Sequence, residues 1–276
     1  MRVLLTIFII LITCLFFTSC NKDEKQLPFP ELNQSIPEGT TDTTQSIFSN
    51  ILKQSIHYSV FLPYGYDTSK ILYPVLYLLH GMGGNHQDWI KHDMARTLNQ
   101  SISDKSCKSM VVIMPEGKSG FYCNNFHGMD FRYEDFLIQE LIPQMELKYR
   151  LKSSRKSRAI AGLSMGGYGT VLNAFKYPDI FCAAYAMSAA IDMGTDAPDI
   201  RTVINEKLLD KTVEFPAFTL ECGTEDFLYS SNQSFNYFLL QKGISHTYLI
   251  SSGTHNWNFW KNCLPKTLKF MSNNYE

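Results

Sequence analysis

The sequence predicts an α/β fold with a mostly parallel central sheet and helices on both of its faces. Short apolar runs, each bounded by turn residues, alternate along the chain with longer amphipathic segments. The interior runs are continuously apolar, as expected for parallel strands that are covered on both faces. This alternation of strand and helix patterns is typical of a layered α/β architecture.

Length and composition favour a single domain. The chain has 276 residues, of which 45% are hydrophobic and 18% are charged, and both shares are ordinary for a globular protein. The formal net charge of -1 gives no field that would recruit nucleic acid, so no nucleic-acid partner is expected. We expect a leader over residues 1–19, a tether and irregular lead-in over 20–50, and one α/β domain over 51–276.

The leader has the pattern of a secretory signal. An apolar run over residues 3–17 follows Arg2, and small residues precede Cys20. The run is shorter than the ~20 apolar residues that a spanning helix needs. The segment resembles a bacterial lipoprotein signal, which implies export, lipidation of Cys20 and anchoring to the cell envelope, most simply the outer membrane. The polar run 22–24 resembles an export tag for surface display. An ordinary thiol at Cys20 and a plain solvated linker are the alternatives.

Strands are predicted where apolar runs end at turn residues. After residue 50, the polar and Ser/Thr-rich composition of the lead-in gives way to these runs. The predicted strands cover residues 56–62, 74–79, 110–114, 159–163, 183–187, 217–221 and 247–250.

Helices are predicted between the strands. The clearest segment is 133–149, where apolar residues recur near a 3.6-residue period and Pro143 is expected to introduce a kink. The segment 188–212 is short, so any lid over a site is expected to be small. Further helices are predicted over residues 86–102, 165–176, 200–209, 231–242 and 258–271.

The motif Gly162-Leu163-Ser164-Met165-Gly166 lies where a predicted strand meets a predicted helix. A GxSxG motif in this context forms a sharp turn that exposes the serine hydroxyl above the sheet, and the glycines leave room for the turn. The helix N-terminus that follows favours developing negative charge. Ser164 is therefore the candidate nucleophile. The alternative is a glycine-rich turn with an incidental serine.

A serine nucleophile requires a histidine base, usually oriented by a carboxylate. In the order Ser, acid, His that accompanies this motif, only His246 and His255 follow Ser164. His246 enters a predicted strand, where a packing role is expected. His255 lies in a loop after the last predicted strand, so it is the candidate base.

The acid should come from the loop after the preceding strand. Asp226 occupies that loop, and we prefer it over its neighbour Glu225, which would point elsewhere. The alternative for Asp226 is a helix N-cap, because aspartate is common in that role.

A tetrahedral oxyanion needs at least two backbone N–H donors. Met165 follows the nucleophile and would supply one. The loop His80-Gly81-Met82-Gly83-Gly84 comes directly after an early strand, and Met82 would supply the other. His80 is expected to bond within this loop. The spacing of six between His80, His86 and His92 fits no common metal site.

The remaining cysteines carry no mechanism in this interpretation. Five cysteines follow Cys20 and contain no CxxC pair, which favours small buried hydrophobic residues over a disulfide framework or a zinc site, with one disulfide bridge as the alternative. The residues are Cys107, Cys123, Cys182, Cys222 and Cys263.

These motifs together resemble the esterase family that includes tributyrin esterases, feruloyl esterases and S-formylglutathione hydrolases, and the tributyrin esterase branch most of all. The resemblance covers about residues 56–270. It departs from the family in the leader and in a shortened region over 192–210. Its motifs are 77–85, Trp89, 133–136, 161–169, 223–229 and 253–257.

The resemblance implies an α/β-hydrolase fold and a serine esterase without a cofactor. Ser164, Asp226 and His255 would be its triad, and the N–H groups of Met82 and Met165 its oxyanion hole. Gly81, Tyr122 and Trp257 are candidate pocket residues. The expected substrates are esters of short acyl or feruloyl groups, including acylated glycans. An acyltransferase or thioesterase with the same triad, and a glycan-binding lipoprotein without catalysis, are the alternatives.

Overall fold

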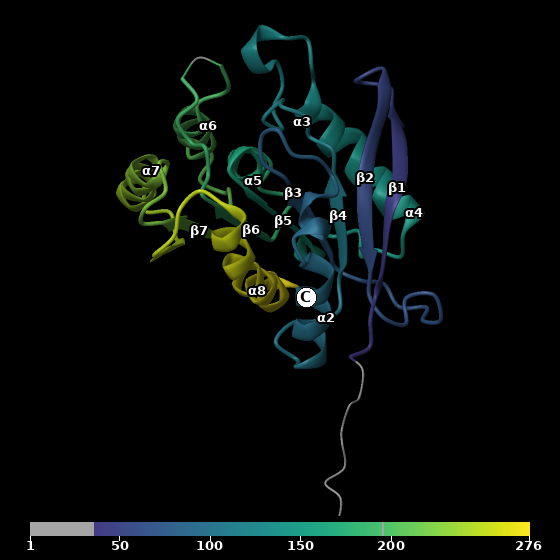
Figure 1. Ribbon diagram of the computed structural model, residues 1–276. Helices are drawn as coiled ribbons and strands as arrows, with labels where there is room; N and C mark the ends of the chain where they lie inside the picture. The colour runs from purple at the N-terminus through teal and green to yellow at the C-terminus, as the bar shows by residue number, and fades with distance from the viewer. Residues whose placement is uncertain (1–35, 195) are drawn as a thin grey trace, which may run out of the picture. The chain divides into compact units, whose positions relative to one another are not determined.

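A computed structural model of the protein describes residues 36–194 and 196–276 (Figure 1). Within these ranges eight strands form one sheet in the order β1-β2-β4-β3-β5-β6-β7-β8. The strands are β1 (Thr40–Ser49), β2 (Gln54–Leu62), β3 (Val75–Leu79), β4 (Val111–Pro115), β5 (Arg158–Leu163), β6 (Ala183–Met187), β7 (Ala217–Gly223) and β8 (Thr247–Ser251).

The sheet is antiparallel at one edge and parallel elsewhere. β1 pairs antiparallel with β2, and β2 pairs antiparallel with β4. All pairs from β4 through β3 to β8 are parallel. The carboxyl ends of the parallel strands therefore meet at one edge of the sheet, where the loops that follow them can build a common site.

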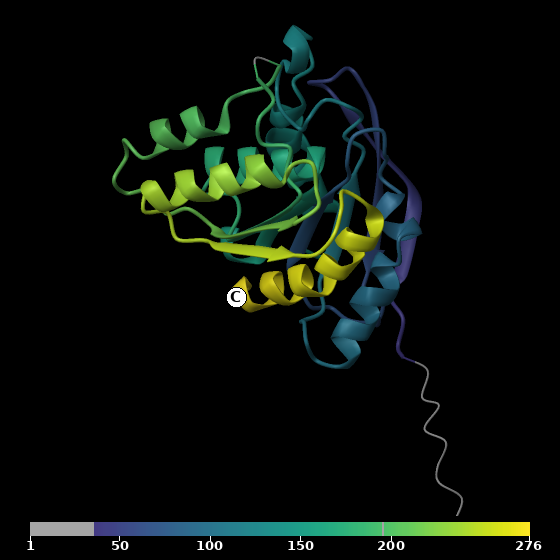
Figure 2. The ribbon, with the colours of Figure 1, turned by 60° about the vertical axis from the view of Figure 1, so that its left-hand side comes forward.

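Helices cover both faces of the sheet (Figures 1 and 2). On β3, Val75, Tyr77 and Leu79 face a core shared with α3 to α7, while Leu76 and Leu78 face a second core shared with α1, α2 and α8. The helices are α1 (Asp88–Lys91), α2 (Met94–Ser103), α3 (Tyr133–Asp135), α4 (Ile142–Lys148), α5 (Met165–Lys176), α6 (Ile200–Lys207), α7 (Tyr229–Gln241) and α8 (Trp257–Asn274), with short 3-10 turns at Phe126–Gly128 and Arg155–Ser157.

The predicted architecture is confirmed, and so are all seven predicted strands. Two helices differ in detail from the prediction. The predicted helix 133–149 contains a π-helical segment, η2 (Phe136–Leu141), directly before the turn that carries Pro143. The predicted helix 86–102 is divided into α1 and α2, because Asp93 has a left-handed backbone conformation with φ of 67°.

The predicted irregular lead-in is wrong for residues 40–49, which form β1. This edge strand packs one end on the core through Ile47 and Ser49, while most of its other side chains face solvent. An edge strand that is mostly exposed does not need apolar residues. The threonine-rich sequence of β1 therefore has the same composition as a linker. The leader, Cys20 and residues 20–35 of the predicted tether lie outside the described residues.

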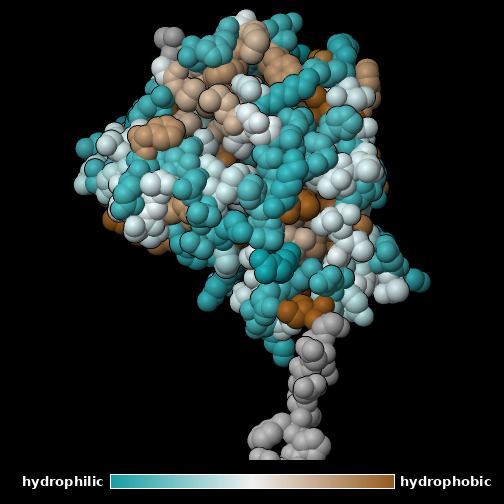
Figure 3. All heavy atoms as spheres, viewed as in Figure 1, coloured by the Kyte–Doolittle hydropathy of each residue, from teal (hydrophilic) through white to brown (hydrophobic). Residues whose placement is uncertain are grey.

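The surface drawn in Figure 3 is mainly polar, with smaller apolar areas between the polar side chains. Among the described residues, no helix combines the length and the apolar character that crossing a membrane requires. The five cysteines named above are free thiols, and four of them are buried, in agreement with the predicted packing role.

Candidate active site

Ser164 lies at the turn between β5 and α5 and has a strained backbone conformation, with φ of 52° and ψ of -114°. Two glycines make this turn possible. A Cβ atom at Gly162 would lie 2.5 Å from the carbonyl oxygen of Gly166, and one at Gly166 would lie 2.6 Å from the carbonyl oxygen of His80. The Ser164 N–H donates to the carbonyl of Met187 on β6 at 2.9 Å. The motif therefore forms the predicted strand-to-helix elbow.

The elbow lies at a point where the chain leaves the sheet in two directions. After β3 the chain enters α1 and α2, which pack in one core, and after the neighbouring β5 it enters α5, which packs in the other. Ligand sites of open α/β sheets form at such points, because the loops diverge and leave a crevice. Ser164 stands at this crevice.

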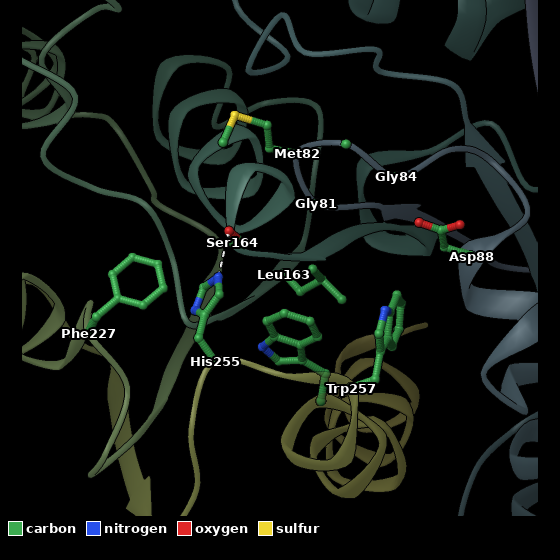
Figure 4. Close-up of a pocket in the computed structure, with 11 residues that line it drawn as sticks. Gly81, Met82, Gly84, Asp88, Leu163, Ser164, Phe227, His255 and Trp257 are labelled. Carbon is green, nitrogen blue, oxygen red and sulfur yellow. Dashed lines mark hydrogen bonds between the residues drawn. The ribbon is translucent and has the colours of Figure 1, made fainter.

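Ser164, His255 and Asp226 form one chain of hydrogen bonds. The Nε2 atom of His255 lies 2.9 Å from Ser164 Oγ (Figure 4). The Nδ1 atom lies 3.0 Å from Asp226 Oδ1 and 2.9 Å from Asp226 Oδ2. The structure thus brings together the three residues that the sequence nominated from three separate loops, at distances that allow proton transfer.

Asp226 is buried, and the surrounding donors hold it as a carboxylate. Burial raises its pKa, but hydrogen bonds from His255, the Leu228 N–H and the Ser188 hydroxyl together outweigh burial, so its pKa is lowered. The Leu228 N–H donates to Oδ1 at 2.8 Å. Asp226 is not the N-cap of α7, since Leu228 occupies that position. Its carboxylate is directed mainly to the imidazole.

The two loops that carry Asp226 and His255 are joined to each other. The Glu225 N–H donates to the carbonyl of Gly253 at 3.1 Å, and the Gly253 N–H donates to the Glu225 carboxylate at 2.5 Å. Asn256 then caps α8 by accepting from the Phe259 N–H at 3.2 Å. Glu225 was expected only to point away from the base. It instead fixes the loop that presents His255.

Aromatic residues surround the imidazole of His255. The ring of Phe227 lies 4.5 Å from it and that of Trp260 lies 4.9 Å from it, between ring centroids. The Trp260 indole N–H donates to Ser188 Oγ at 3.1 Å. The sequence placed Phe227 within the motif 223–229 without a role, and it did not single out Trp260 or Ser188. Phe227 follows the acid and Trp260 lies one helical turn after Trp257, and those two positions were the only signals available.

The loop after β3 lies against the nucleophile. A Cβ atom at Gly81 would be 3.6 Å from Ser164 Cβ and 2.7 Å from a methyl group of Leu163, so a larger residue would require the Leu163 side chain to move. The Gly84 N–H closes a turn onto the Gly81 carbonyl at 3.2 Å. Met82 sits in this turn and lines the same cleft as Ser164. Met165 is the first residue of α5, so its N–H lies outside the bonding of the helix.

Tyr122 is not a pocket residue, contrary to expectation. Its ring is fully buried, and its hydroxyl accepts from the His80 N–H at 3.0 Å and donates to the His80 carbonyl at 3.1 Å. Tyr122 therefore supports the start of the loop after β3 from the protein interior, through the backbone of His80. His80 bonds within the loop as predicted, since its Nδ1 lies 2.7 Å from the Gly81 carbonyl. The residue type of Tyr122 alone does not tell whether its ring faces the cleft or the protein interior.

His246 has the packing role expected of it. Its two ring nitrogens lie 2.8 Å from the Ile244 carbonyl and from Asn236 Oδ1. In the part of the chain that the structure describes, no group of His, Cys, Asp and Glu is arranged to hold a metal ion.

The site opens into a cleft of about 380 Å³. Of the predicted pocket residues, Gly81 and Trp257 line it, and Figure 4 shows Phe227 and Asp88 on opposite sides of Ser164. Such a site can bring an activated hydroxyl to a carbonyl carbon beside backbone donors. The lining residues are Gly81, Met82, Gly83, Gly84, Asp88, Leu163, Ser164, Phe227, His255, Trp257 and Trp260.

Comparison with known proteins identifies the family. Residues 49–271 match the family described as "Putative esterase". An acetyl esterase of Caldicellulosiruptor saccharolyticus is 26% identical over 82% of this chain and 96% of its own length. An endo-1,4-beta-xylanase/feruloyl esterase of Xylanibacter ruminicola is 31% identical over 75% of this chain, which spans only 28% of that protein.

Solved structures agree with the sequence relatives. The structure of a ferulic acid esterase superposes with a TM-score of 0.76 and 28% identity, covering 86% of this chain and 99% of that one. An S-formylglutathione hydrolase from Staphylococcus aureus, at a TM-score of 0.72 and 22% identity, covers 86% of this chain and 98% of its own and shares the fold. The protein is thus a member of this esterase family, with the α/β-hydrolase fold and the activity of a carboxylic ester hydrolase.

Proposed function

We propose that the protein is a serine esterase in which Ser164 is the nucleophile, His255 the general base and Asp226 the acid that orients it. The observation that carries this proposal is the unbroken chain of hydrogen bonds from Asp226 through His255 to Ser164 at 2.9 to 3.0 Å. A packing role explains His255 less well, because its two ring nitrogens bond a hydroxyl at the mouth of a cleft and a buried carboxylate.

The reaction has two steps. His255 Nε2 takes the Ser164 proton as Oγ forms a bond to the ester carbonyl carbon, and the N–H groups of Met82 and Met165 receive the oxyanion. Collapse of the tetrahedral intermediate breaks the bond to the alcohol oxygen, which leaves with the proton from His255. Water, deprotonated by the same imidazole, then attacks the acyl carbon, and collapse of this second intermediate breaks the bond to Ser164 Oγ, which takes the proton from His255 as the carboxylic acid leaves.

Short acyl or feruloyl esters, including those on glycans, are the proposed substrates. The named activities of the relatives support this class, since one is an acetyl esterase and another is joined to a xylanase as a feruloyl esterase. The cleft of about 380 Å³ is lined by Trp257, Trp260 and Phe227 and has room for a substituted ring or a short chain. Such a mixture of aromatic walls and few polar groups is typical of small-molecule sites.

The test compares wild type with Ser164→Ala on 4-nitrophenyl acetate, butyrate and octanoate, and on methyl ferulate. We expect kcat/KM to fall by several orders of magnitude in the variant, as for removal of a triad member. Ser153→Ala, at an exposed position, is the matched control and should retain wild-type rates. Equal weak rates in Ser164→Ala and wild type would overturn the triad and favour a glycan-binding role. Acetylated and feruloylated xylan then test the glycan assignment, which fails if only synthetic esters react.

We also propose that the protein is exported and held on the envelope membrane by a lipid on Cys20. The support is the leader sequence alone, with its apolar run and small residues before Cys20. The wild-type protein should appear in the membrane fraction and incorporate labelled palmitate. A Cys20→Ser variant should lose both properties, and an unlabelled wild-type protein would contradict the proposal.

A further inference from the structure

We infer that Asp88 is a specificity-determining residue that accepts a hydrogen bond from a hydroxyl group on a ring of the substrate and disfavours esters that carry a negative charge at that position. The inference rests on the proposed esterase function and adds to it a chemical class of substrate. The ring belongs either to a phenolic acyl group or to a sugar alcohol, and in both cases the recognised group is a neutral hydroxyl donor.

Asp88 faces the cleft across the turn that also approaches the nucleophile. It is among the residues that line the cleft, and Figure 4 shows it to one side of Ser164, with Phe227 on the other. A Cβ atom at Gly84 would lie 2.1 Å from Asp88 Oδ2, so the carboxylate packs directly on the Gly81–Gly84 turn. A ring attached to the reacting ester can therefore extend along this turn toward Asp88.

One carboxylate oxygen of Asp88 is used by the protein and the other is largely free. Oδ2 accepts from the Asn85 N–H at 3.1 Å, and the Asn85 side chain accepts from the Gln87 N–H at 2.9 Å, which together stabilise the start of α1. Among the described residues, the only polar group near Oδ1 is the ammonium group of Lys91, 3.8 Å away, and the Lys91 side chain is 54% exposed. Capping of α1 therefore accounts for the position of Oδ2, while Oδ1 can still accept a hydrogen bond from a ligand.

A rigid aromatic wall lies next to this acceptor. Trp257 lines the cleft on the same side of Ser164 as Asp88 (Figure 4). The His92 ring stacks on it with centroids 3.8 Å apart, and the rings of Trp89 and Trp260 meet it edge to face at 5.2 and 5.4 Å. These neighbours fix the orientation of the indole. A fixed aromatic surface beside a hydroxyl acceptor fits a flat or chair-shaped ring with a hydroxyl substituent.

The charges of the cleft favour a neutral donor over an anion. Apart from His255, Asp88 is the one ionisable side chain among the lining residues that the structure describes, and no Lys or Arg lines the cleft. A carboxylate on the substrate would meet the Asp88 charge, and the Lys91 ammonium group beside Oδ1, 3.8 Å away, is largely exposed to solvent and is not part of the cleft lining. A hydroxyl group in the same place would donate to it, and hydrogen bonds to charged groups are the stronger ones.

The experiment measures ratios of kcat/KM within each variant, so that a general loss of rate cancels. Wild type and Asp88→Asn are assayed on methyl ferulate against methyl 3,4-dimethoxycinnamate, and on methyl 2-O-acetyl-xyloside against its 3,4-di-O-methyl ether. Methyl 4-carboxycinnamate is the anionic ester. The amide oxygen of asparagine can still accept from the Asn85 N–H, and thermal unfolding of the variant checks this. Asp67→Asn, in an exposed turn, is the matched control.

We expect at least one hydroxyl-to-ether ratio to fall about tenfold in Asp88→Asn, the difference between a hydrogen bond to a charged and to a neutral acceptor. The relative rate on the anionic ester should rise by a similar factor, and Asp67→Asn should show neither change. The pair that responds tells whether the ring is phenolic or a sugar. Unchanged ratios with continuing Ser164-dependent hydrolysis would overturn the role of Asp88 and leave the esterase function standing. Absence of Ser164-dependent hydrolysis of every ester would overturn both.

Discussion

His255 Nδ1 is bound by both carboxylate oxygens of Asp226, at 3.0 and 2.9 Å, while its Nε2 faces Ser164. This arrangement leaves one tautomer for catalysis, in which Nδ1 carries the proton and Nε2 is free to accept the serine proton. The neighbouring carboxylate of Glu225 makes no such contact and bonds the Gly253 N–H. Asp226 therefore orients the imidazole and Glu225 stabilises the loop, and single substitutions can distinguish these two roles.

We predict that Asp226→Asn lowers kcat/KM by about three to four orders of magnitude, because an amide at this position favours the wrong imidazole tautomer. Glu225→Gln should cost far less, since its amide oxygen can still accept from the Gly253 N–H. The measurement is hydrolysis of 4-nitrophenyl acetate by both variants, with circular dichroism as a check of folding. Equal losses in the two variants would contradict the assignment of Asp226 as the acid.

The same residue predicts a pH dependence of stability. The pKa of Asp226 is lowered in the folded protein, since hydrogen bonds from His255, Leu228 and Ser188 outweigh the opposing effect of burial. Because the pKa of Asp226 is lower in the folded protein than in the unfolded one, its ionised form stabilises the fold at pH values above the ordinary aspartate pKa. This stabilisation is lost as the pH falls through the pKa of Asp226 in the folded protein.

Urea unfolding of wild type and Asp226→Asn between pH 7 and pH 3 measures this contribution. The difference in unfolding free energy between the two proteins should be largest near neutral pH and should shrink on acidification. A difference that stays constant over the whole range would show that the Asp226 charge does not contribute to stability.

The elbow glycines give a third prediction. A methyl group at Gly162 would meet the Gly166 carbonyl oxygen at 2.5 Å and Leu79 Cβ at 2.8 Å. Gly162→Ala should lower the free energy of unfolding by about 1–3 kcal/mol through overpacking and should displace Ser164 from His255. Urea unfolding and esterase assays measure the two effects.

Gly65→Ala separates steric overlap from backbone strain. A Cβ atom at Gly65 would have its nearest contact with Thr68 Oγ1 at 3.9 Å, so only the left-handed φ of 75° is unfavourable. The substitution should lower the free energy of unfolding by about 1–2 kcal/mol. Activity should remain at the wild-type level in this control. A Gly162→Ala variant with wild-type activity would show that the elbow can relax around a methyl group.

The triad could be predicted from sequence because each of its members follows a strand of the parallel sheet in a fixed order. Ser164, Asp226 and His255 each have a local signal, whereas the residues that hold them do not. Ser188 and Trp260 meet through a hydrogen bond between segments 72 residues apart. Such contacts depend on how β6 and α8 pack together, and no period or motif in either segment encodes that packing.

The two errors have a similar origin. Tyr122 was placed in the pocket because of its residue type, but its hydroxyl is directed to the backbone of His80 under the loop. β1 was missed because an exposed edge strand lacks the apolar pattern of a buried one. In both cases the decisive partner lies far away in the sequence, so local pattern had nothing to detect.

One such distant partner explains how β1 is held in place. Glu140, in the π-helical segment η2, accepts from the hydroxyl of Ser49 at 2.5 Å and from the N–H groups of Asn50 and Ile51 at 3.0 and 3.2 Å. The wider turn of a π-helix is often found where a helix serves a specific contact. The carboxylate satisfies three donors of the β1–β2 turn with one side chain.

We predict that Glu140→Ala lowers the free energy of unfolding by about 1–3 kcal/mol, because three donors lose a charged acceptor. Gln139→Ala, at the exposed neighbouring position in the same segment, should change it by less than about 0.5 kcal/mol. Urea unfolding gives the two values, and hydrogen exchange of the Asn50 and Ile51 amides reports the local effect. Since β1 lies at the sheet edge away from Ser164, kcat/KM should stay at the wild-type level in Glu140→Ala. Equal stabilities of the two variants would show that strand pairing alone holds β1 to the domain.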